Sequence, residues 1–538
     1  MKVIIVGGVA GGATAAARIR RLSEEADITI YERTSFVSYA NCGLPYYIGD
    51  VINDDSNLTL ATPSSLYNRY RINVKTSHEV IDIDSISKKV TVKDLMTQEV
   101  FTESYDKLLL SPGAKPLTLD FLNTYNNVFT LRTVEDTVKI KDVVTKTDPK
   151  KVAVIGGGFV GLEMTENLVN LGIEVTLIHK DESLLNILDY DMSSFVYNHL
   201  ISKGVKVLLS TDAIDIIDDS YDMILVSIGI KPDNTLAEKA GLELDLRGSI
   251  LVNDKMETSV KDIYAVGDAV SIKQIVTGEV KMISLAGPAN KEARVAADNI
   301  CGLESHYKGS LSSSVLKVFD LTVATTGITE KVAKSLNYDY EKVILSPSNH
   351  ASYYPGATQM HLKVIYDKNT KLILGAQAVG KELVEKRIDV IATAIYAKLS
   401  ALDLKDLDLC YAPPYNTAKD PVNLAGFIID NIESGIVKQF YYEDIEKLQE
   451  NSDVILLDTR TPQEYKRGFV EGFINIPLDV LRGNLHLLDK TKKIYVMCHS
   501  GMRSYLSSRI LLENGFEAYN FVGGYLLFAN ISKMEANH

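Results

Sequence analysis

The sequence has 538 residues, of which 46% are hydrophobic and 24% charged, a composition typical of a soluble globular protein with several domains. A net charge of −13 without a basic tract argues against a nucleic-acid or anionic-membrane partner. Four cysteines, at positions 42, 301, 410 and 498, are too few and too scattered for a disulfide framework and favour a reducing cytoplasm. No apolar run approaches the roughly 18 residues that span a bilayer, and the first residues lead directly into an expected strand, so we expect neither a membrane span nor a signal peptide.

The chain begins with the pattern of a dinucleotide-binding fold. An apolar run at residues 3–6 predicts a buried strand, and residues 13–22 predict a helix. Glu32 ends the next expected strand, where a carboxylate can accept a hydrogen bond from a ribose hydroxyl. Glycines between strand and helix allow a tight turn that brings the helix N-terminus to a pyrophosphate. The turn consists of Gly7, Gly8, Val9, Ala10, Gly11 and Gly12, with Val9 where the usual pattern has its middle glycine.

Cys42 lies ten residues after Glu32, in a polar turn punctuated by glycine and proline. Ligands of open α/β sheets bind outside the carboxyl ends of the strands, so a thiol at this place would face the reactive end of a bound dinucleotide. We therefore interpret Cys42 as a redox residue. The alternative is a buried cysteine that acts only as a small hydrophobic residue.

A second dinucleotide fingerprint follows the expected strand at residues 152–155. It is a full glycine pattern with Gly156, Gly158 and Gly161. The next expected strand ends in His179, not in Asp or Glu, so the usual acceptor for the ribose hydroxyl of NAD is missing and a 2′-phosphate can be tolerated. Both NADH and NADPH remain open.

Three later segments support two dinucleotide folds. The turn after one expected strand contains Ser111 and Gly113, and the turn after another contains Gly229. The expected strand at residues 263–266 leads into Gly267 and Asp268. Over residues 1–430 this order of motifs resembles the two-dinucleotide flavoprotein disulfide reductases. The resemblance implies that the first fingerprint binds FAD with the help of Asp268, and that the second binds the nicotinamide nucleotide. It also implies that Arg33 contacts FAD and that Glu163 lies at the nicotinamide site.

Cys42 determines the branch of this superfamily. Members that store electrons in a disulfide have a second cysteine five positions later, where this sequence has Tyr47. Members with one thiol either cycle through a sulfenic acid, as NADH peroxidases and oxidases do, or form a mixed disulfide with coenzyme A. The peroxidases resemble one another in a histidine where this chain has Ala10. Residues 6–14 and 38–45 resemble coenzyme A-disulfide reductases.

This resemblance implies a polyanionic substrate. Arg18 and Arg21 lie three residues apart on one face of the first helix, where they are either an ordinary solvated face or a site for the coenzyme A phosphates. Tyr70 occupies a position where a cation is expected, so Arg69 or Arg71 is a candidate replacement. The further substrate contacts that the resemblance implies are Thr14, Ser38, Asn41, Tyr70, Asn290 and Lys419.

The region from residue 311 to 432 has alternating apolar strands at 362–366 and 372–376 and a helix at 389–399, and reads as an α+β module. The resemblance implies that it is a dimerisation domain. It also implies that Tyr353 and Tyr411 reach Cys42 of the other subunit, where their hydroxyls can protonate a leaving coenzyme A thiolate. Otherwise they are ordinary amphipathic tyrosines of surface loops.

The last region contains a strand that ends in Asp458 and Arg460, and a second strand that leads into Cys498. Over residues 435–538 the pattern resembles single-domain rhodaneses, which implies that Cys498 carries sulfur and that Arg503 contacts the substrate. Successive backbone N–H groups at a helix N-terminus stabilise a thiolate or persulfide. The other two cysteines, at 301 and 410, are expected to pack.

We therefore predict an α/β protein with two Rossmann-like dinucleotide-binding domains, an α+β dimerisation domain and an α/β rhodanese domain. The expected ranges are 1–115 with 250–310 for FAD, 116–249 for NAD(P)H, 311–432 and 433–538. The predicted function is NAD(P)H-dependent reduction of coenzyme A disulfide, coenzyme A persulfide or polysulfide, coupled to sulfur transfer in a homodimer without a metal. The alternatives are an NADH oxidase or peroxidase that uses Cys42 as a sulfenic acid, and a last domain that is only a sulfur carrier or docking module.

Overall fold

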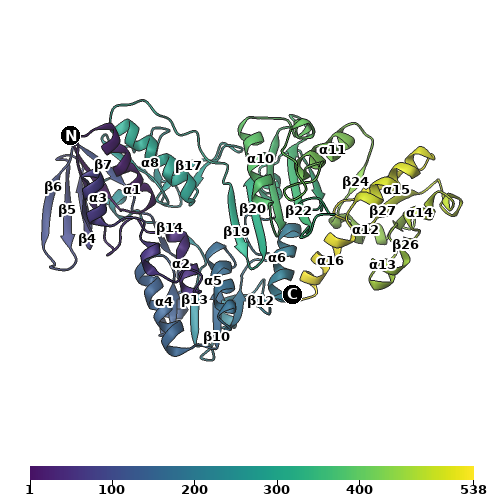
Figure 1. Cartoon of the computed structure of the whole chain (residues 1–538), viewed down its shortest axis with the longest axis horizontal. Coiled ribbons are helices and arrows are strands. Elements are labelled where there is room, and N and C mark those ends of the chain that lie inside the picture. The colour runs from purple at the N-terminus through teal and green to yellow at the C-terminus, as the bar shows by residue number, and fades with distance from the viewer. Residues whose placement is uncertain (538) are drawn as a thin grey trace. The chain divides into compact units, whose positions relative to one another are not determined.

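The computed structural model describes residues 1–537, which form two compact units (Figure 1). The first unit comprises residues 1–181 and 204–312. The second comprises residues 182–203 and the described residues from 313 onwards. The segment 182–203 therefore belongs to a different unit from the residues that flank it in the chain. The four domain ranges expected from the sequence remain predictions.

The N-terminal fold is built on a parallel sheet whose strands are apolar throughout. Val3, Ile4 and Ile5 are completely buried, in a core that also contains Ala16 and Val90. The strand order is β16 (Ile263–Ala265), β7 (Lys107–Leu110), β1 (Lys2–Val6), β2 (Asp27–Tyr31) and β3 (Asn73–Lys75). Helix α1 (Ala10–Leu22) follows β1 and packs against α8 (Ala286–Ile300). It begins earlier than the sequence predicted, since the last glycines of the turn already belong to its first turn.

A second parallel sheet follows the same plan in the same unit. Its strand order is β12 (Lys206–Leu208), β11 (Glu174–Ile178), β10 (Lys151–Ile155), β13 (Met223–Val226) and β9 (Val128–Thr130). Helix α5 (Phe159–Asn170) follows β10 as α1 follows β1. The short antiparallel pair of β8 (Ala114–Pro116) and β14 (Ile230–Pro232) connects the two sheets.

Two smaller sheets, one antiparallel and one mixed, belong to the first unit. One consists of β4 (His78–Asp84), β5 (Lys89–Asp94) and β6 (Val100–Ser104). The other consists of β15 (Ile250–Leu251), β17 (Val270–Lys273) and β18 (Val280–Met282), and β15 pairs with β17 in parallel. The remaining helices of this unit are α2 (Leu44–Ile48), α3 (Pro63–Tyr70), α4 (Val134–Thr147) and α7 (Thr235–Lys239).

An antiparallel sheet forms the centre of the second unit. Its strand order is β19 (Ser314–Val318), β20 (Leu321–Gly327), β23 (Ile373–Gly380), β22 (Met360–Asp367) and β21 (Tyr340–Leu345). The associated helices are α6 (Tyr190–Ser202), α9 (Glu330–Ser335), α10 (Val384–Tyr396) and α11 (Pro421–Glu433). The α+β character predicted for this region is present, although α10 begins and ends earlier than the predicted helix at 389–399.

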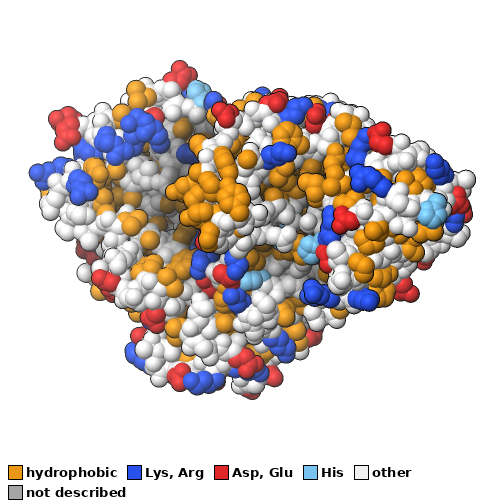
Figure 2. Space-filling view, turned by 45° about the vertical axis from the view of Figure 1, so that its right-hand side comes forward, with side chains coloured by type: hydrophobic (Ala, Val, Ile, Leu, Met, Phe, Trp, Pro, Cys, Tyr) orange, Lys and Arg blue, Asp and Glu red, His pale blue; other side chains and the backbone are white. Residues whose placement is uncertain are grey.

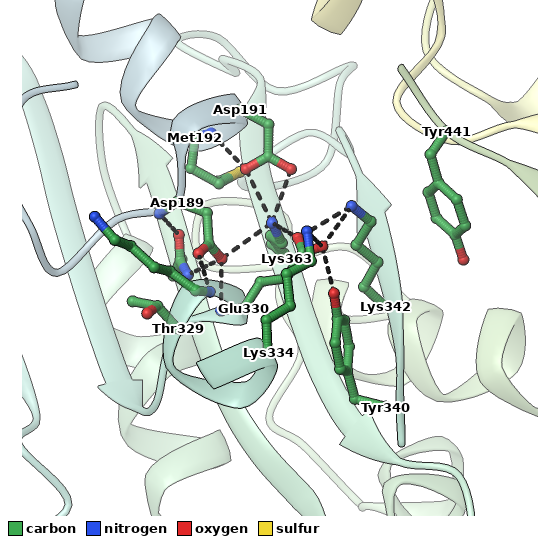
Figure 3. A network of polar contacts seen from close by, with 12 residues as sticks. Asp189, Asp191, Met192, Thr329, Glu330, Lys334, Tyr340, Lys342, Lys363 and Tyr441 are labelled. Atoms are coloured by element: carbon green, nitrogen blue, oxygen red, sulfur yellow. Dashed lines mark hydrogen bonds and ion pairs between the residues drawn. The ribbon is translucent and has the colours of Figure 1, made fainter. Parts of the chain in front are cut away.

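A buried lysine ties the inserted helix α6 to this sheet (Figure 3). Lys363 on β22 is completely buried, and its Nζ lies 3.0 Å from Asp189, 2.8 Å from Asp191 and 2.8 Å from Glu330. Lys342 on the neighbouring strand pairs with Glu330 at 3.0 Å. A buried ammonium is tolerated only when carboxylates and hydrogen bonds compensate the lost hydration. The insertion 182–203 supplies two of those carboxylates.

The C-terminal part of the second unit has a parallel sheet of its own. The strand order is β24 (Gln439–Phe440), β28 (Ala518–Phe521), β27 (Lys493–Met497), β25 (Val454–Asp458) and β26 (Ile474–Asn475). The helices are α12 (Ile445–Gln449), α13 (Pro462–Arg467), α14 (Leu478–Leu481), α15 (Met502–Glu513) and α16 (Gly524–Glu535). A 3₁₀ turn, η6 (Tyr442–Asp444), leads directly into α12.

Acidic and basic side chains both occur across the visible face of the molecule (Figure 2). Among the described residues, none of the helices combines the length and the hydrophobicity that crossing a bilayer requires.

Candidate active sites

The first glycine turn packs closely against the backbone around it, so that side chains have no room at two of its positions. Gly7 has φ +91°, and a Cβ there would overlap the carbonyl oxygen of Ser111. A Cβ on Gly12 would overlap the carbonyl oxygen of Gly7. Gly8 N–H donates to Oε2 of the buried Glu32 at 2.8 Å. Bare backbone before a helix N-terminus, beside a buried carboxylate, fits the pyrophosphate and ribose of a dinucleotide.

The second glycine turn repeats this arrangement with a different acceptor. Gly156 has φ +108°, and a Cβ on Gly161 would overlap the Gly156 carbonyl oxygen. Gly157 N–H donates to Nδ1 of His179 at 3.1 Å. His179 thus takes the place that Glu32 has in the first turn, as the sequence spacing predicts. The turn fits a second dinucleotide and offers an imidazole instead of a carboxylate at the ribose. Gly158 faces open space and Gly229, with φ +120°, is exposed.

The Gly-Asp turn after β16 contains a contact that the sequence did not indicate. Asp268 forms an ion pair with Arg132 at 2.5 Å. Gly267 N–H donates to Oε2 of Glu292 at 2.8 Å, and burial raises the pKa of this carboxyl to about 7. Arg132 stands 136 positions before Asp268 and carries no local motif, so only the fold reveals it.

Arg33, which was predicted to contact FAD, joins the first fold to the strand pair β8–β14. Its guanidinium lies 2.6 Å from Asp233, which also pairs with Lys115 at 2.8 Å. The Asp233 N–H donates to the carbonyl oxygen of Gly113 at 3.0 Å. The predicted residues Arg33 and Gly113 therefore meet through Asp233.

Cys42 lies in a short 3₁₀ turn, η1 (Asn41–Gly43), directly before α2. Ala40 N–H donates to the Leu58 carbonyl oxygen at 2.7 Å, and Gly43 N–H donates to the Ala40 carbonyl oxygen at 2.8 Å. These bonds hold the turn at both ends. The thiol is exposed in the chain, which argues against the alternative of a packed hydrophobic cysteine.

The charges around Cys42 come from both dinucleotide folds. Helix α2 packs against α5, where Tyr46 Oη donates to Oε1 of Glu163 at 3.4 Å. Burial raises the pKa of Glu163 to about 7. The pKa of Cys42 is also raised, first by desolvation and then by the negative charges of Glu163 and Asp268, while Arg132 opposes this. The thiolate, not the thiol, is the nucleophile. The reactivity of Cys42 therefore depends on a group that accepts the proton of its thiol.

Predicted substrate residues meet along the contact between α1 and α8. Thr14 Oγ1 donates to Oδ1 of Asn290 at 2.7 Å. Arg18 pairs with Asp298 at 2.7 Å, so its Nε is engaged within the protein. Arg21 is exposed.

The other predicted substrate residues of the first unit lie close to its glycine turn or to the end of α1. Ser38 has φ +50° and donates its N–H to a carbonyl oxygen of the glycine turn, and Asn41 lies in the same 3₁₀ turn as Cys42. Arg20 Nε donates to the carbonyl oxygen of Tyr70 at 2.7 Å, and its terminal nitrogen donates to that of Arg71 at 3.0 Å. This arginine anchors Tyr70 and the exposed Arg71 beside α1.

In the second unit, the two predicted tyrosines are hydrogen-bonded to each other. The hydroxyl oxygens of Tyr353 and Tyr411 lie 2.8 Å apart, and the side chains are 74% and 47% exposed. The bond to Tyr411 raises the pKa of Tyr353. Asn416 connects the two loops, because its backbone carbonyl oxygen accepts a hydrogen bond from Ala351 N–H at 3.0 Å. Lys419, three residues further along the chain, is exposed.

The predicted sulfur-carrying residue, Cys498, directly follows β27 and begins the loop to α15. Cys498 is only 1% exposed, and its sulfur accepts from Gly501 N–H at 3.1 Å and from Ser504 Oγ at 3.2 Å. Tyr525 N–H, in the first turn of α16, donates to the Cys498 carbonyl oxygen at 2.8 Å. The sulfur thus has a backbone N–H and a hydroxyl as donors, an arrangement that can hold a negatively charged sulfur. Ser504 belongs to the loop motif in the sequence, but its hydrogen bond to the Cys498 sulfur was not predicted.

Arg503, the predicted substrate contact of this loop, is engaged by a carboxylate. Its two terminal nitrogens donate to the two oxygens of Glu464 at 2.7 and 2.6 Å. The remaining cysteines differ from each other: Cys301 packs against the core of the first fold, whereas Cys410 is exposed, so the expectation of packing is wrong for Cys410.

Family models match most of the chain. The pyridine nucleotide-disulphide oxidoreductase model matches residues 1–293, its dimerisation domain matches 313–421, and the rhodanese-like domain matches 442–530. The chain therefore belongs to the pyridine nucleotide-disulphide oxidoreductases and carries a C-terminal rhodanese-like domain. This confirms the predicted fold class.

Individual relatives are more specific. The coenzyme A disulfide reductase of Staphylococcus haemolyticus is 39% identical over 437 residues, which is 79% of this chain and 98% of that protein. The crystal structure of reduced Bacillus anthracis CoADR-RHD is 44% identical with a TM-score of 0.96, covering 99% of this chain and 98% of that one. An NAD-dependent persulfide reductase from A. fulgidus is 36% identical with a TM-score of 0.92, covering 98% and 100%. The resemblance stated from the sequence is confirmed.

Proposed function

We propose that the chain reduces coenzyme A disulfide or coenzyme A persulfide with NAD(P)H and FAD through Cys42, and that its rhodanese-like domain transfers sulfur. The observation that carries the proposal is the single exposed thiol of Cys42, beside Tyr46 and Glu163, in a turn where Tyr47 replaces a second cysteine. Two of its relatives, a coenzyme A disulfide reductase and a persulfide reductase, support the substrate class.

Two groups of residues would hold the cofactors. The FAD site would consist of Gly7, Gly8, Val9, Ala10, Gly11, Gly12, Glu32, Arg33, Ser111, Gly113, Gly267 and Asp268. The nicotinamide site would consist of Gly156, Gly158, Gly161, Glu163, His179 and Gly229. When bound, the flavin and nicotinamide supply the electron pair that returns Cys42 to a free thiolate.

The chain's own chemistry is thiol exchange. The Cys42 thiolate attacks a sulfur of coenzyme A disulfide, the S–S bond breaks, and a Cys42–coenzyme A mixed disulfide forms as coenzyme A thiolate leaves. With coenzyme A persulfide the same mixed disulfide forms and hydrosulfide leaves. Arg18 and Arg21, with Thr14, Ser38, Asn41, Tyr70, Asn290 and Lys419, are proposed to bind the substrate.

We further propose a cytoplasmic homodimer. The dimerisation-domain match and the exposed pair Tyr353 and Tyr411 support an active site completed by a second copy of the chain, whose tyrosines protonate the leaving thiolate. The four cysteines are all free thiols, which fits a reducing compartment.

The experiment is the Cys42→Ser substitution. We expect the variant to retain FAD and to be reduced by NAD(P)H, but to lose turnover of coenzyme A disulfide, because electrons reach the substrate sulfur only through the thiolate. The control is Cys301→Ser, which removes a thiol that packs against the core of the first fold. Disulfide turnover in Cys42→Ser at the rate of the control would refute the assignment, and faster consumption of peroxide or oxygen than of disulfide by the unmodified protein would favour an oxidase.

A further inference from the structure

We propose that Glu464 makes the Cys498 site selective for organic persulfide donors over thiosulfate, because Glu464 occupies the guanidinium group of Arg503. This inference deepens the proposed sulfur-transfer role of the rhodanese-like domain and rests on it. It concerns which sulfur donor the thiol loop can accept.

The pair between Arg503 and Glu464 is bidentate and well supported. Both terminal nitrogens of the guanidinium are used, at 2.7 and 2.6 Å, and the two side chains are 31% and 29% exposed. Thr461 holds the carboxylate from the other side, since its N–H donates to Oε2 at 2.9 Å and its Oγ1 donates at 2.8 Å. Arg503 holds the pKa of Glu464 well below its usual range, so the carboxylate stays charged at neutral pH. An incoming sulfonate group would have to displace it.

A second arginine beside the loop is compensated in the same way. Arg460 is 2% exposed, and its Nε and terminal nitrogen donate to Asp458, the latter at 2.7 Å. The guanidinium also lies 3.8 Å from the ring centroid of Tyr525, the residue that binds the Cys498 carbonyl oxygen. Asp458 therefore cancels the charge of Arg460.

The histidine next to the thiol adds no positive charge. Burial lowers the pKa of His499, so its ring is neutral at neutral pH. The donors that the structure shows on the Cys498 sulfur are a backbone N–H and a hydroxyl. Such neutral donors stabilise a single negative charge on sulfur, but they do not offset a doubly charged group next to it.

The chemistry of the two donor classes differs in the leaving group. With a persulfide, the Cys498 thiolate attacks the terminal sulfur of R–S–SH, the S–S bond breaks, and Cys498–S–SH forms with release of R–S⁻. With thiosulfate, the same attack forms Cys498–S–S⁻ and must release sulfite with two negative charges. Only the second reaction brings a dianion to the loop, and there the arginine that could neutralise it is already paired.

The first test uses the unmodified full-length protein. Reduced protein is exposed to glutathione persulfide or to thiosulfate at equal concentration, and the persulfide on Cys498 is followed over time by mass spectrometry. We expect thiosulfate to load Cys498 at least about tenfold more slowly, the size of effect that a lost charge-assisted bond produces. Equal loading rates would overturn the proposal.

The second test changes the pair. Glu464→Gln keeps an oxygen that can accept from Thr461 but removes the charge, so we expect the loading rate with thiosulfate, relative to glutathione persulfide, to rise at least about tenfold. Adding Arg503→Ala in the same chain should abolish that gain. The matched control is Glu471→Gln, an exposed carboxylate of the same domain. An unchanged donor ratio in Glu464→Gln, or a gain that persists without Arg503, contradicts the proposal; if Glu464→Gln does not fold, the comparison in the unmodified protein decides alone.

The outcomes separate this inference from the function on which it rests. If Cys498 takes sulfur from neither donor, the proposed sulfur transfer fails and the selectivity fails with it. If it takes sulfur equally from both, only the selectivity fails. Reduction of coenzyme A disulfide, measured on the same samples, tests the role of Cys42 independently.

Discussion

Single residues set very different conditions for the two reactive thiols. Desolvation, and then the negative charges of Glu163 and Asp268, raise the pKa of Cys42 and so favour its protonated form. Cys498 is buried and accepts hydrogen bonds from Gly501 and Ser504, which favour a negatively charged sulfur. The two thiols therefore differ in their surroundings: carboxylates act on Cys42, whereas a backbone N–H and a hydroxyl contact the sulfur of Cys498.

The pH dependence of Cys42 should report the ionisation of Glu163. Below about pH 7 the Glu163 carboxyl is protonated and uncharged, and above this pH its charge opposes ionisation of the thiol. Glu163→Gln removes that charge, so the pKa of Cys42 should fall and alkylation of Cys42 should be faster than in the unmodified protein, mainly above about pH 7. The measurement is the alkylation rate of Cys42 between pH 5 and about pH 10, followed by mass spectrometry.

Glu174→Gln is the matched control, because Glu174 is an exposed carboxylate on β11 of the same fold. Superimposable pH profiles for Glu163→Gln and the control would show that Glu163 does not govern the thiol.

The acceptor at the second glycine turn should control the choice of nucleotide. His179→Glu would place a carboxylate where Nδ1 now accepts from Gly157, beside the ribose position. A carboxylate accepts from the 2′-hydroxyl of NADH and repels the 2′-phosphate of NADPH. We expect the ratio of kcat/KM for NADPH to that for NADH to fall about tenfold or more. His179→Asn, which keeps an uncharged acceptor, separates the effect of charge from loss of the imidazole, and an equal fall in both variants would contradict the electrostatic explanation.

At the scale of elements, the insertion 182–203 is held to β22 by a buried ion cluster. Its helix α6 also contacts α16, where Asn198 Nδ2 donates to the carbonyl oxygen of Asn530 at 2.8 Å. The first turn of α16 binds the loop of Cys498 through Tyr525. The inserted helix, the antiparallel sheet and the loop of Cys498 therefore belong to one packed unit.

Removing the central cation should destabilise this unit strongly. Lys363→Met leaves three carboxylates buried or partly buried without the ammonium that neutralises them. Breaking such a cluster by removing one partner costs about 3–5 kcal/mol. We expect a correspondingly lower free energy of unfolding in denaturant titrations, and faster proteolysis within residues 182–203.

Lys334→Met is the control, because Lys334 pairs with the same Glu330 at 2.9 Å but is 59% exposed. An exposed pair of this kind contributes about 0–1 kcal/mol. If both variants lose the same free energy of unfolding, the burial of Lys363 does not explain its contribution to stability.

At the scale of the whole molecule, the two thiols belong to different units that share one chain. Tethering raises the effective concentration of an intermediate that both units use. We propose coenzyme A as that intermediate: it accepts sulfur from Cys498 as a persulfide, and Cys42 then releases the sulfur as hydrosulfide. No direct contact between Cys42 and Cys498 is required.

The relay predicts that Cys498→Ser lowers sulfide release from polysulfide, with NAD(P)H and catalytic coenzyme A, while Cys42 still reduces coenzyme A disulfide. A mixture of separately produced halves should release sulfide more slowly than the intact chain, because the tether is lost. Cys301→Ser again serves as the control. If Cys498→Ser matches the unmodified protein with every sulfur donor, the first 430 residues are the whole reductase.

The sequence by itself determined the family, the fold class and the order of the reactive segments. Strands buried on both faces are continuous apolar runs, and the turns that follow them need glycine, so both dinucleotide folds have local patterns. The loop of Cys498 is likewise contiguous, and Tyr47 after Cys42 shows that a second thiol is missing. These features depend on near neighbours in the chain and can be recognised without knowing how it folds.

Only the tertiary structure decided which charged groups act on these segments. Tyr46 and Glu163 are 117 positions apart, Arg503 and Glu464 are 39 apart, and β22 recruits carboxylates from an insertion in another fold. Such pairs leave no local pattern, because a charged residue on a helix looks the same whether it faces water or a partner. Their energies depend on burial and on distances of a few ångströms, which arise only when distant segments pack together.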